Sequence, residues 1–207
     1  MEYRRLLARR RMVRSYLPDP VDPSALERIA RAALRAPSAG HSQGISVLVI
    51  TDRDRRAAVA SLAGEGSYVA RGRDPWLSRA PAHIVLCVEP GRYHRRYSEP
   101  DKDPAALAIP WWWVDAGAAL MAVLLAAADE GLGAGFLGAH AIPGLGDLVG
   151  LPDGVTPLGV VTIGHPTDRA PVVKSPPKRP EHEVLHGERW GLPAIIPSAD
   201  EQDQSPS

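Results

Sequence analysis

WWWVDAGAALMAVLLAAADE, residues 111–130, is the segment around which the rest of this chain is organised. Alanine and leucine dominate it, and both residues favour a helix. Its apolar side chains lie around most of the helical circumference, so the helix must be buried on nearly all sides. In a protein of 207 residues, such complete burial points to a second subunit.

Strands and shorter helices are predicted on both sides of this central helix. Asp22 followed by Pro23 predicts a helix start, Pro37 marks the end of that helix, and Asp52 predicts the cap of another. The expected strands are 45–50, 82–88, 133–138 and 156–164, and the expected further helices are 2–10, 23–35, 53–62 and 144–149.

Two stretches, 64–80 and 91–110, have no clear period and are interpreted as irregular segments that could form a lid. After Pro166 the chain is expected to continue as an extended, proline-rich arm. We expect one domain over residues 1–190 and a C-terminal tail over 191–207, disordered from about residue 198.

Composition excludes several classes of protein. The formal charge is +0, so no overall field attracts nucleic acid. The single cysteine, Cys87, excludes a disulfide and a CxxC site. The longest apolar run, 116–128, is shorter than the roughly 20 residues that span a bilayer, and the charged N-terminus lacks a signal peptide. We therefore expect a cytoplasmic protein without membrane or nucleic-acid partners.

Familiar catalytic motifs are absent or out of place. Gly133-x-Gly135-x-x-Gly138 matches a dinucleotide fingerprint only as a string, because it follows a helix instead of opening one. His182 and His186 lack a third ligand, so we expect no metal site. No GxSxG motif is present. A bound cofactor would therefore have to carry any demanding chemistry.

Three distant segments together offer what a phosphorylated planar cofactor needs. They are RRRMVRSY at 9–16, APSAGHSQ at 36–43 and PPKRP at 176–180. Guanidinium forks bind a phosphate bidentately, and a turn of small residues lets backbone N–H groups approach a ligand. The alternative is that these arginines only cover solvated faces.

Five motifs in sequence order resemble the nitroreductase family of FMN-dependent oxidoreductases. RRMVRSY (10–16) is similar to the family's RRSxRxF/Y opening. PSAGHSQ (37–43) is similar to its PSxxNxQPW turn, and closer to the form found in iodotyrosine deiodinases. GLG (131–133), the strand ending in IGHP (163–166), and KRPEHEV (178–184) with Trp190 resemble its later segments.

The resemblance implies an α+β, nitroreductase-like fold with a mixed, mostly antiparallel sheet flanked by helices. It also implies an intertwined homodimer with FMN at the subunit interface, and residues 1–190 as the FMN-binding domain. The residues that fall on the family's cofactor contacts are Arg10, Arg11, Met12, Arg14, Pro37, Ser38, Ala39, His41, Leu137, Gly138, Lys178 and Arg179.

Each group of these residues carries a role by resemblance. The first arginines would contact the flavin phosphate, ribityl chain and pyrimidine edge, and Lys178 with Arg179 would anchor the phosphate again. The turn at 37–39 would lie along the isoalloxazine, contributed by the partner subunit. A backbone N–H near Gly138 would face flavin N5. Met12, His41 and Gly44 depart from the family pattern.

The resemblance further implies hydride transfer from NADH or NADPH through FMN to a nitroaromatic, quinone or other conjugated acceptor, in a ping-pong cycle without a catalytic side chain. Trp76, Tyr97 and Arg71 are the substrate-binding candidates, although the two aromatics could equally pack the loops down. The alternatives are reductive dehalogenation, chemistry like that of dimethylbenzimidazole synthases, flavin storage, and nucleic-acid binding by the basic arm.

Overall fold

The computed structural model describes residues 2–168 and 177–194. The chain divides into two compact units, residues 1–170 and 171–207. The first unit contains the sheet and the long helix, and the described part of the second contains one short 3-10 turn, Glu181–Glu183. The single domain expected over 1–190 stays a prediction.

A four-stranded sheet forms the centre of the first unit, in the order β1-β2-β4-β3. Its strands are β1 (Ile45–Ile50), β2 (Ala82–Val88), β3 (Gly133–Gly138) and β4 (Thr156–Gly164). Every neighbouring pair is antiparallel. A single parallel bridge then joins Met12 to Ala134 at the β3 edge. The expectation of a mixed, mostly antiparallel sheet is thus confirmed.

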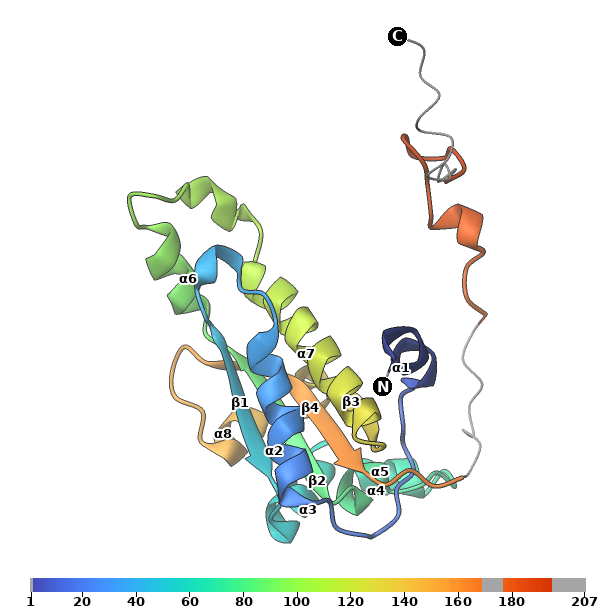
Figure 1. Cartoon of the computed structure of the whole chain (residues 1–207). Coiled ribbons are helices and arrows are strands. Elements are labelled where there is room, and N and C mark those ends of the chain that lie inside the picture. Colours follow the sequence, from blue (N-terminus) through green and yellow to red (C-terminus); the bar gives the residue numbers. More distant parts are fainter. Residues whose placement is uncertain (1, 169–176, 195–207) are drawn as a thin grey trace. The chain divides into compact units, whose positions relative to one another are not determined.

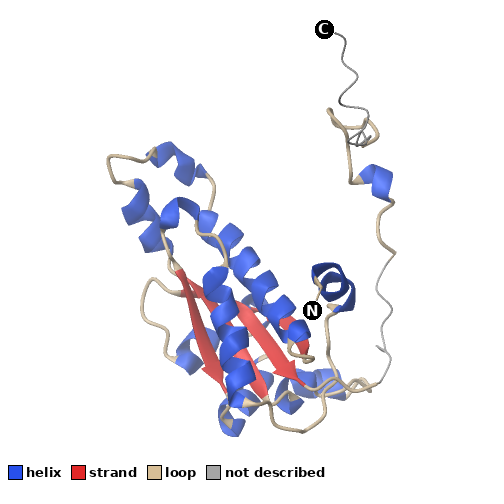
Figure 2. Ribbon diagram, viewed as in Figure 1, coloured by secondary structure: helices blue, strands red, loops and turns tan. Residues whose placement is uncertain are grey.

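Helices cover both faces of this sheet (Figures 1 and 2). Helices α7 (Trp111–Asp129) and α2 (Pro23–Ala32) pack on one face, and α3 (Arg53–Leu62) and α8 (Leu145–Val149) pack on the other. Strand β2 explains this layering, because side chains alternate across a sheet. Its Ile84 faces the α7 side and its Val85 faces the α8 side, and both are fully buried.

The helix starts follow the predicted caps. The carboxylate of Asp22 accepts hydrogen bonds from the backbone N–H groups of Ser24 and Ala25, at 3.3 and 3.0 Å. Asp52 accepts one from the N–H of Arg55 at 2.9 Å. These bonds satisfy donors that the first helical turn leaves unpaired. Helix α2 then tightens into a 3-10 turn, Ala33–Arg35, before Pro37.

The prediction of irregular structure was wrong for much of 64–80 and 91–110. The first stretch contains α4 (Glu65–Val69) and α5 (Trp76–Arg79), and the second contains most of α6 (Pro90–Tyr97) and a 3-10 turn, Pro104–Ala108. Helices α4 and α5 are too short for a hydrophobic period to emerge. Helix α6 does carry two buried tyrosines four positions apart, Tyr93 and Tyr97, within an otherwise polar sequence. Pro90 at the first position and ion pairs from Glu89 to Arg92 and Arg95 also stabilise α6.

Helix α7 is confirmed, but its complete burial is not found within one chain. Its inner face, which includes Ala119 and Val123, is buried against the sheet and α2. Trp113, Val114 and Met121 on the outer face are 40%, 55% and 37% exposed. By length and composition alone, α7 could cross a membrane. Its inner face nevertheless packs on the sheet, and Asp115 in its first turns is buried.

Candidate functional site

Residues 10–14, the arginine segment, lie against β3 and pair with it through one isolated bridge. The N–H of Val13 donates to the carbonyl of Ala134 at 2.8 Å, beside the parallel bridge from Met12 to the same residue. Val13 is buried, while Arg11, Met12 and Arg14 are exposed. The pairing therefore fixes the backbone of the segment and leaves its cationic side chains free to meet a ligand.

The glycines of β3 permit this close approach. A Cβ on Gly135 would overlap the carbonyl oxygen of Val13 and lie 2.9 Å from both Thr162 Oγ1 and Trp76 Cζ3. A Cβ on Gly133 would lie 2.9 Å from the Val13 side chain. The GxGxxG string is thus a strand that lets another backbone approach, as expected, and not a phosphate loop at a helix start.

Tyr16 holds the arginine segment against the sheet through buried hydrogen bonds. Its side chain is fully buried, and its hydroxyl donates to the carbonyl of Val13 at 2.9 Å and lies 2.7 Å from the hydroxyl of Thr162 in β4. Burial raises the pKa of this phenol well above its usual value, so it stays protonated and able to donate.

Arg10 and Arg11 line a cavity of about 390 Å³ between the arginine segment, the start of β3 and the end of α7. Leu124 and Ala128 of α7 form its apolar wall. Arg14 points elsewhere, with its guanidinium 5.5 Å from the centre of the Trp76 ring. Arg9 lines the same cavity, so three arginines gather where guanidinium groups can meet an anion, while Arg14 stacks on an aromatic face.

Trp76 is held in place by a buried carboxylate. Glu65, 7% exposed, accepts from the N–H of Leu77 at 2.6 Å and from that of Ser78 at 3.2 Å. Those two N–H groups belong to the first turn of α5, which begins at Trp76. Glu65 therefore caps α5 from outside the helix and fixes the ring beneath Arg14.

Replacing Glu65 with alanine is expected to destabilise the protein by about 2 kcal/mol, because two buried N–H donors lose a charged acceptor. Urea unfolding followed by circular dichroism measures this cost. Glu27→Ala on the exposed face of α2 is the control, since its ion pair with Arg31 is solvated and contributes less than about 1 kcal/mol. Equal midpoints for both variants would contradict the capping role of Glu65.

The second predicted part of the site, the turn at residues 37–43, lies at the other end of α7. The N–H of Ala39 donates to Asp115 in the first turns of α7 at 2.9 Å. The hydroxyl of Ser42 donates to the carbonyl of Ala39 at 2.7 Å. His41 and Gln43 expose their side chains. Within one chain, this turn and the arginine segment do not meet (Figure 1).

The remaining predicted residues lie in several places. Leu137 and Gly138 end β3, where Leu137 packs against buried side chains. Trp76 and Tyr97 are 5% and 9% exposed, so both make packing contacts in the single chain. Arg71 donates to the carbonyl of Ser67. Lys178 and Arg179 are exposed in the second unit, where Arg179 pairs with Glu183.

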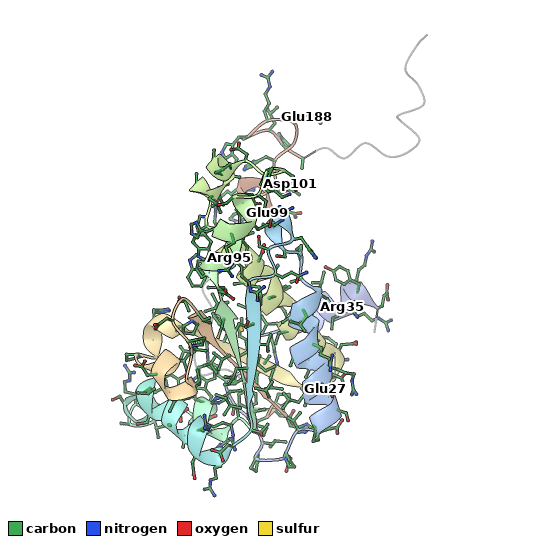
Figure 3. The ribbon with its side chains drawn as sticks, turned by 90° about the vertical axis from the view of Figure 1, so that its left-hand side faces the viewer. Glu27, Arg35, Arg95, Glu99, Asp101 and Glu188 are labelled. Atoms are coloured by element: carbon green, nitrogen blue, oxygen red, sulfur yellow. The ribbon has the colours of Figure 1, made fainter. Side chains whose placement is uncertain are left out.

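Three residues outside the predicted site support the turn. Asp115, buried in α7, and Arg96 of α6 bond to the turn directly, and Tyr93 of α6 bonds to Asp115. Tyr93 and Arg96 were expected only as residues of a possible lid, and Asp115 was not singled out. Figure 3 shows that α6 and the loop after it, with Arg95, Glu99 and Asp101, form a charged end of the first unit. Residues 91–110 were expected to be irregular, so no helical face was available to place Tyr93 and Arg96 together.

Other kinds of site are not evident in the described residues. No three His, Cys, Asp or Glu side chains there could hold a metal ion. Cys87 is buried, and burial raises the pKa of its thiol to about 11, so it is a poor nucleophile at neutral pH. A larger cavity of about 1160 Å³ lies between α2 and β1 and includes none of the predicted site residues.

Comparison with known proteins places this geometry in a family. The pattern of the Nitroreductase family matches residues 7–165. The chain is 31% identical to the FMN reductase (NAD(P)H) of Bacillus subtilis, over 93% of this chain and 77% of that protein. It is 29% identical to the oxygen-insensitive NADPH nitroreductase of Salmonella typhimurium, over 89% of this chain and 73% of that protein.

A solved structure agrees with these sequence relationships. The NADPH:FMN oxidoreductase of Vibrio harveyi, determined in complex with NAD+, superposes with a TM-score of 0.70 at 26% identity, and the match covers 96% of this chain and 80% of that one. The shared fold, the docked arginine segment and the family match over most of the sequence lead to one conclusion. The chain belongs to the Nitroreductase family.

Proposed function

We propose that this protein is an FMN-dependent NAD(P)H oxidoreductase that works as a homodimer. The observation that carries the proposal is the arginine segment, docked on a glycine strand so that Arg10 and Arg11 line one cavity. The relatives named FMN reductase and NADPH nitroreductase support the same activity. Their names favour hydride transfer over dehalogenation, flavin fragmentation or flavin storage.

The residues present fit FMN. Arg10 and Arg11 would hold its phosphate through bidentate hydrogen bonds, and Arg14, above Trp76, would stabilise negative charge on the ring system. The close approach at Gly135 keeps these groups at a fixed spacing. Bound FMN would supply hydride chemistry, accepting from NADH or NADPH and passing electrons to an acceptor. The protein would orient the reactants and exclude water.

A second copy would complete the site. Asp115, which binds the turn, and Ala128, which lines the arginine cavity, are 13 positions apart on α7, or about 20 Å along a helix. A two-fold axis across the outer face of α7 would bring the turn of one chain beside the arginine segment of its partner. The exposed Trp113, Val114 and Met121 suit such an interface.

Replacing Val114 with glutamate is expected to dissociate the dimer, since a charge on each copy would be buried in an apolar interface. Size-exclusion chromatography with light scattering measures the mass, and flavin absorbance measures retained FMN. Leu62→Glu, at an exposed position of α3 on the other face of the sheet, is the control and should stay dimeric with bound FMN. A dimeric, yellow Val114→Glu protein would refute this interface.

The oxidoreductase activity is tested by anaerobic reduction. The purified protein should be yellow and release FMN on denaturation. Under strict exclusion of oxygen, NADPH or NADH should bleach the flavin, and a nitroaromatic or quinone should restore the colour. A protein that binds no added FMN would overturn the proposal. Bound flavin that neither nucleotide bleaches would leave the storage function as the better description.

The acceptor and the location belong to the same proposal. Trp76, Tyr97 and Arg71 remain the candidates for acceptor binding, with residues 64–80 and 91–110 as the segments that would cover the flavin. We place the enzyme in the cytoplasm, where NAD(P)H is available. Arg9 to Arg14 would serve the cofactor and not nucleic acid, because the chain has a formal charge of +0.

A further inference from the structure

The turn at residues 37–43 has an unusual backbone. Gly40, His41 and Gln43 have φ angles of 60°, 58° and 51°. Among the described residues, His41 and Gln43 are the non-glycine positions with positive φ. Such conformations cost on the order of 1 kcal/mol or more each and persist only where neighbouring structure enforces them. Both residues are exposed, so this strained backbone places the imidazole of His41 and the amide of Gln43 at the surface.

Two buried residues, Asp115 and Tyr93, hold this backbone in place. Oδ2 of Asp115 accepts from the N–H of Ala39 at 2.9 Å and from the hydroxyl of Tyr93 at 2.7 Å. Asp115 is 4% exposed and Tyr93 is fully buried. Asp115 forms no ion pair with a described residue, so hydrogen bonds alone compensate its burial. Burying a carboxylate costs free energy, so a position that served only core packing would favour an apolar residue over Asp115.

Tyr93 is fitted closely to the turn. A Cβ on Gly44 would overlap the Tyr93 ring, which explains why glycine follows the turn where the family pattern has proline. The Trp112 ring packs edge-on against the Tyr93 ring, with 6.0 Å between the ring centroids. Burial, and then the hydrogen bond to Asp115, raise the pKa of the Tyr93 phenol far above its usual value. The hydroxyl therefore remains a donor to Asp115 at any working pH.

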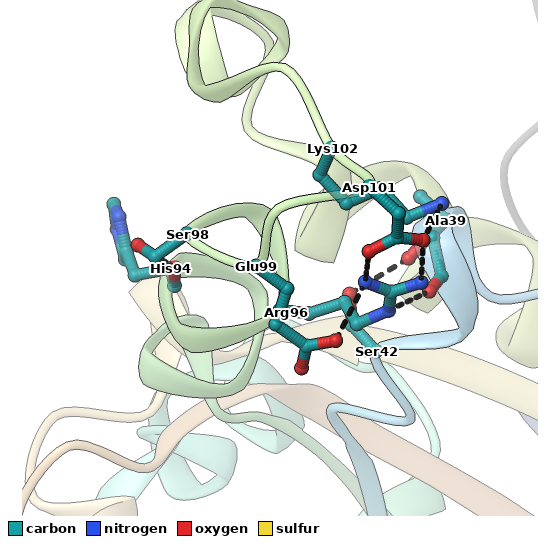
Figure 4. A network of polar contacts seen from close by, with 9 residues as sticks. Ala39, Ser42, His94, Arg96, Ser98, Glu99, Asp101 and Lys102 are labelled. Carbon is teal, nitrogen blue, oxygen red and sulfur yellow. Dashed lines mark hydrogen bonds and ion pairs between the residues drawn. The ribbon is translucent and has the colours of Figure 1, made fainter.

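A second contact holds the turn from the α6 side (Figure 4). Nε of Arg96 donates to the carbonyl of Gly40 at 2.9 Å. The same guanidinium is fixed by a two-bond fork to Asp101, at 2.7 and 2.8 Å, and by Glu99 at 2.8 Å. The N–H of Ala39 and the C=O of Gly40 are thus both tied to neighbouring helices.

We propose that Asp115 and Tyr93, with Arg96 as their counterpart, are positioning residues that hold the turn in its left-handed conformation and thereby set the affinity for the flavin. Asp115 and Tyr93 are buried and would not touch the cofactor. They act through the backbone N–H of Ala39, which immediately precedes the left-handed residues. The inference rests on the proposed function, and it adds residues outside the five family motifs.

The experiment compares three variants with the wild type. Tyr93→Phe keeps the ring and removes the donor, Asp115→Ala removes the acceptor, and Asp115→Asn retains an oxygen that can accept both bonds. FMN affinity is measured by quenching of flavin fluorescence. We expect about tenfold weaker binding for Tyr93→Phe and Asp115→Ala, and recovery to within about twofold for Asp115→Asn.

Hydrogen exchange of the peptide containing residues 36–44 gives a direct readout of the turn. The Ala39 amide should exchange at least tenfold faster in Tyr93→Phe and Asp115→Ala, in the apo and FMN-bound forms alike. Val59→Ala, in the core behind the sheet, is the stability-matched control and should leave both measurements unchanged. Arg96→Lys, at a side chain 22% exposed, tests the second contact in a variant that folds.

The outcomes separate the two proposals. A wild-type protein that does not bind FMN defeats the proposed function. A wild type that binds FMN, with Tyr93→Phe, Asp115→Ala and Arg96→Lys equally tight and equally protected at Ala39, defeats the positioning role. Weaker binding by Val59→Ala to the same degree would also defeat it, because general loss of stability would then explain the effect.

Discussion

Gly135→Ala is expected to cost about 3 kcal/mol of stability, at the upper end for overpacking in a filled core. The new methyl group would overlap the backbone oxygen of Val13, and a backbone atom cannot rotate away as a side chain can. The arginine segment would have to leave β3, taking Arg10, Arg11 and Arg14 with it. FMN binding should therefore be lost together with the stability.

Urea unfolding and FMN titration measure these two effects on the same preparation. Gly66→Ala is the matched control, because a Cβ there meets open space within helix α4. The control should be unchanged or more stable by up to about 1 kcal/mol, since alanine loses less entropy than glycine on helix formation. A Gly135→Ala protein with normal stability would show that the segment does not dock on β3.

Acidification is expected to destabilise the protein through His83. This residue of β2 is fully buried, and burial lowers its pKa from 6.5 to about 4. The unfolded chain therefore binds more protons between these two values. The stability that depends on His83 is complete above about pH 6.5 and falls as the pH is lowered, by about 3 kcal/mol at pH 4.

His83→Gln isolates this effect from the titration of surface carboxylates. The imidazole Nε2 lies 2.8 Å from the carbonyl of Leu77, and a glutamine amide can donate to the same oxygen without acquiring a charge. Urea midpoints at pH 7, 5.5 and 4 should fall more steeply for the wild type than for the variant. Parallel curves would mean that His83 is charged, or solvated, in the folded state.

The strands and capped helices were predictable because each depends on neighbouring residues. The run ISVLVI at Ile45–Ile50 predicts a strand from its own residues, and Asp22-Pro23 predicts a helix start in the same way. The complete burial expected of α7 is not found within one chain, and the second subunit that would cover its outer face stays a proposal. Helix α6 was missed because its apolar face consists of only two tyrosines, Tyr93 and Tyr97, in a stretch that is otherwise polar.

The candidate site was predictable to a similar extent. The arginine segment and the turn are each one continuous stretch of sequence. Their residue types alone therefore predict an anion-binding segment and a turn that a ligand can approach. The support for the turn comes from Asp115, 76 positions away from Ala39, and from Tyr93. Asp115 is an isolated aspartate in an apolar helix, and Tyr93 lies in a stretch that was expected to be irregular. Only the fold brings them together.

The placement of the arginine segment and the turn at opposite ends of α7 has a consequence for mixed assemblies. Each dimer would contain two equivalent centres, and each centre would take one half from each polypeptide. A chain whose arginine segment is disrupted and another whose turn at residues 37–43 is disrupted would each lose activity alone. If the two chains are expressed together, some dimers would contain one of each. In such a dimer one centre would contain both defects and the other centre neither, so part of the activity would return.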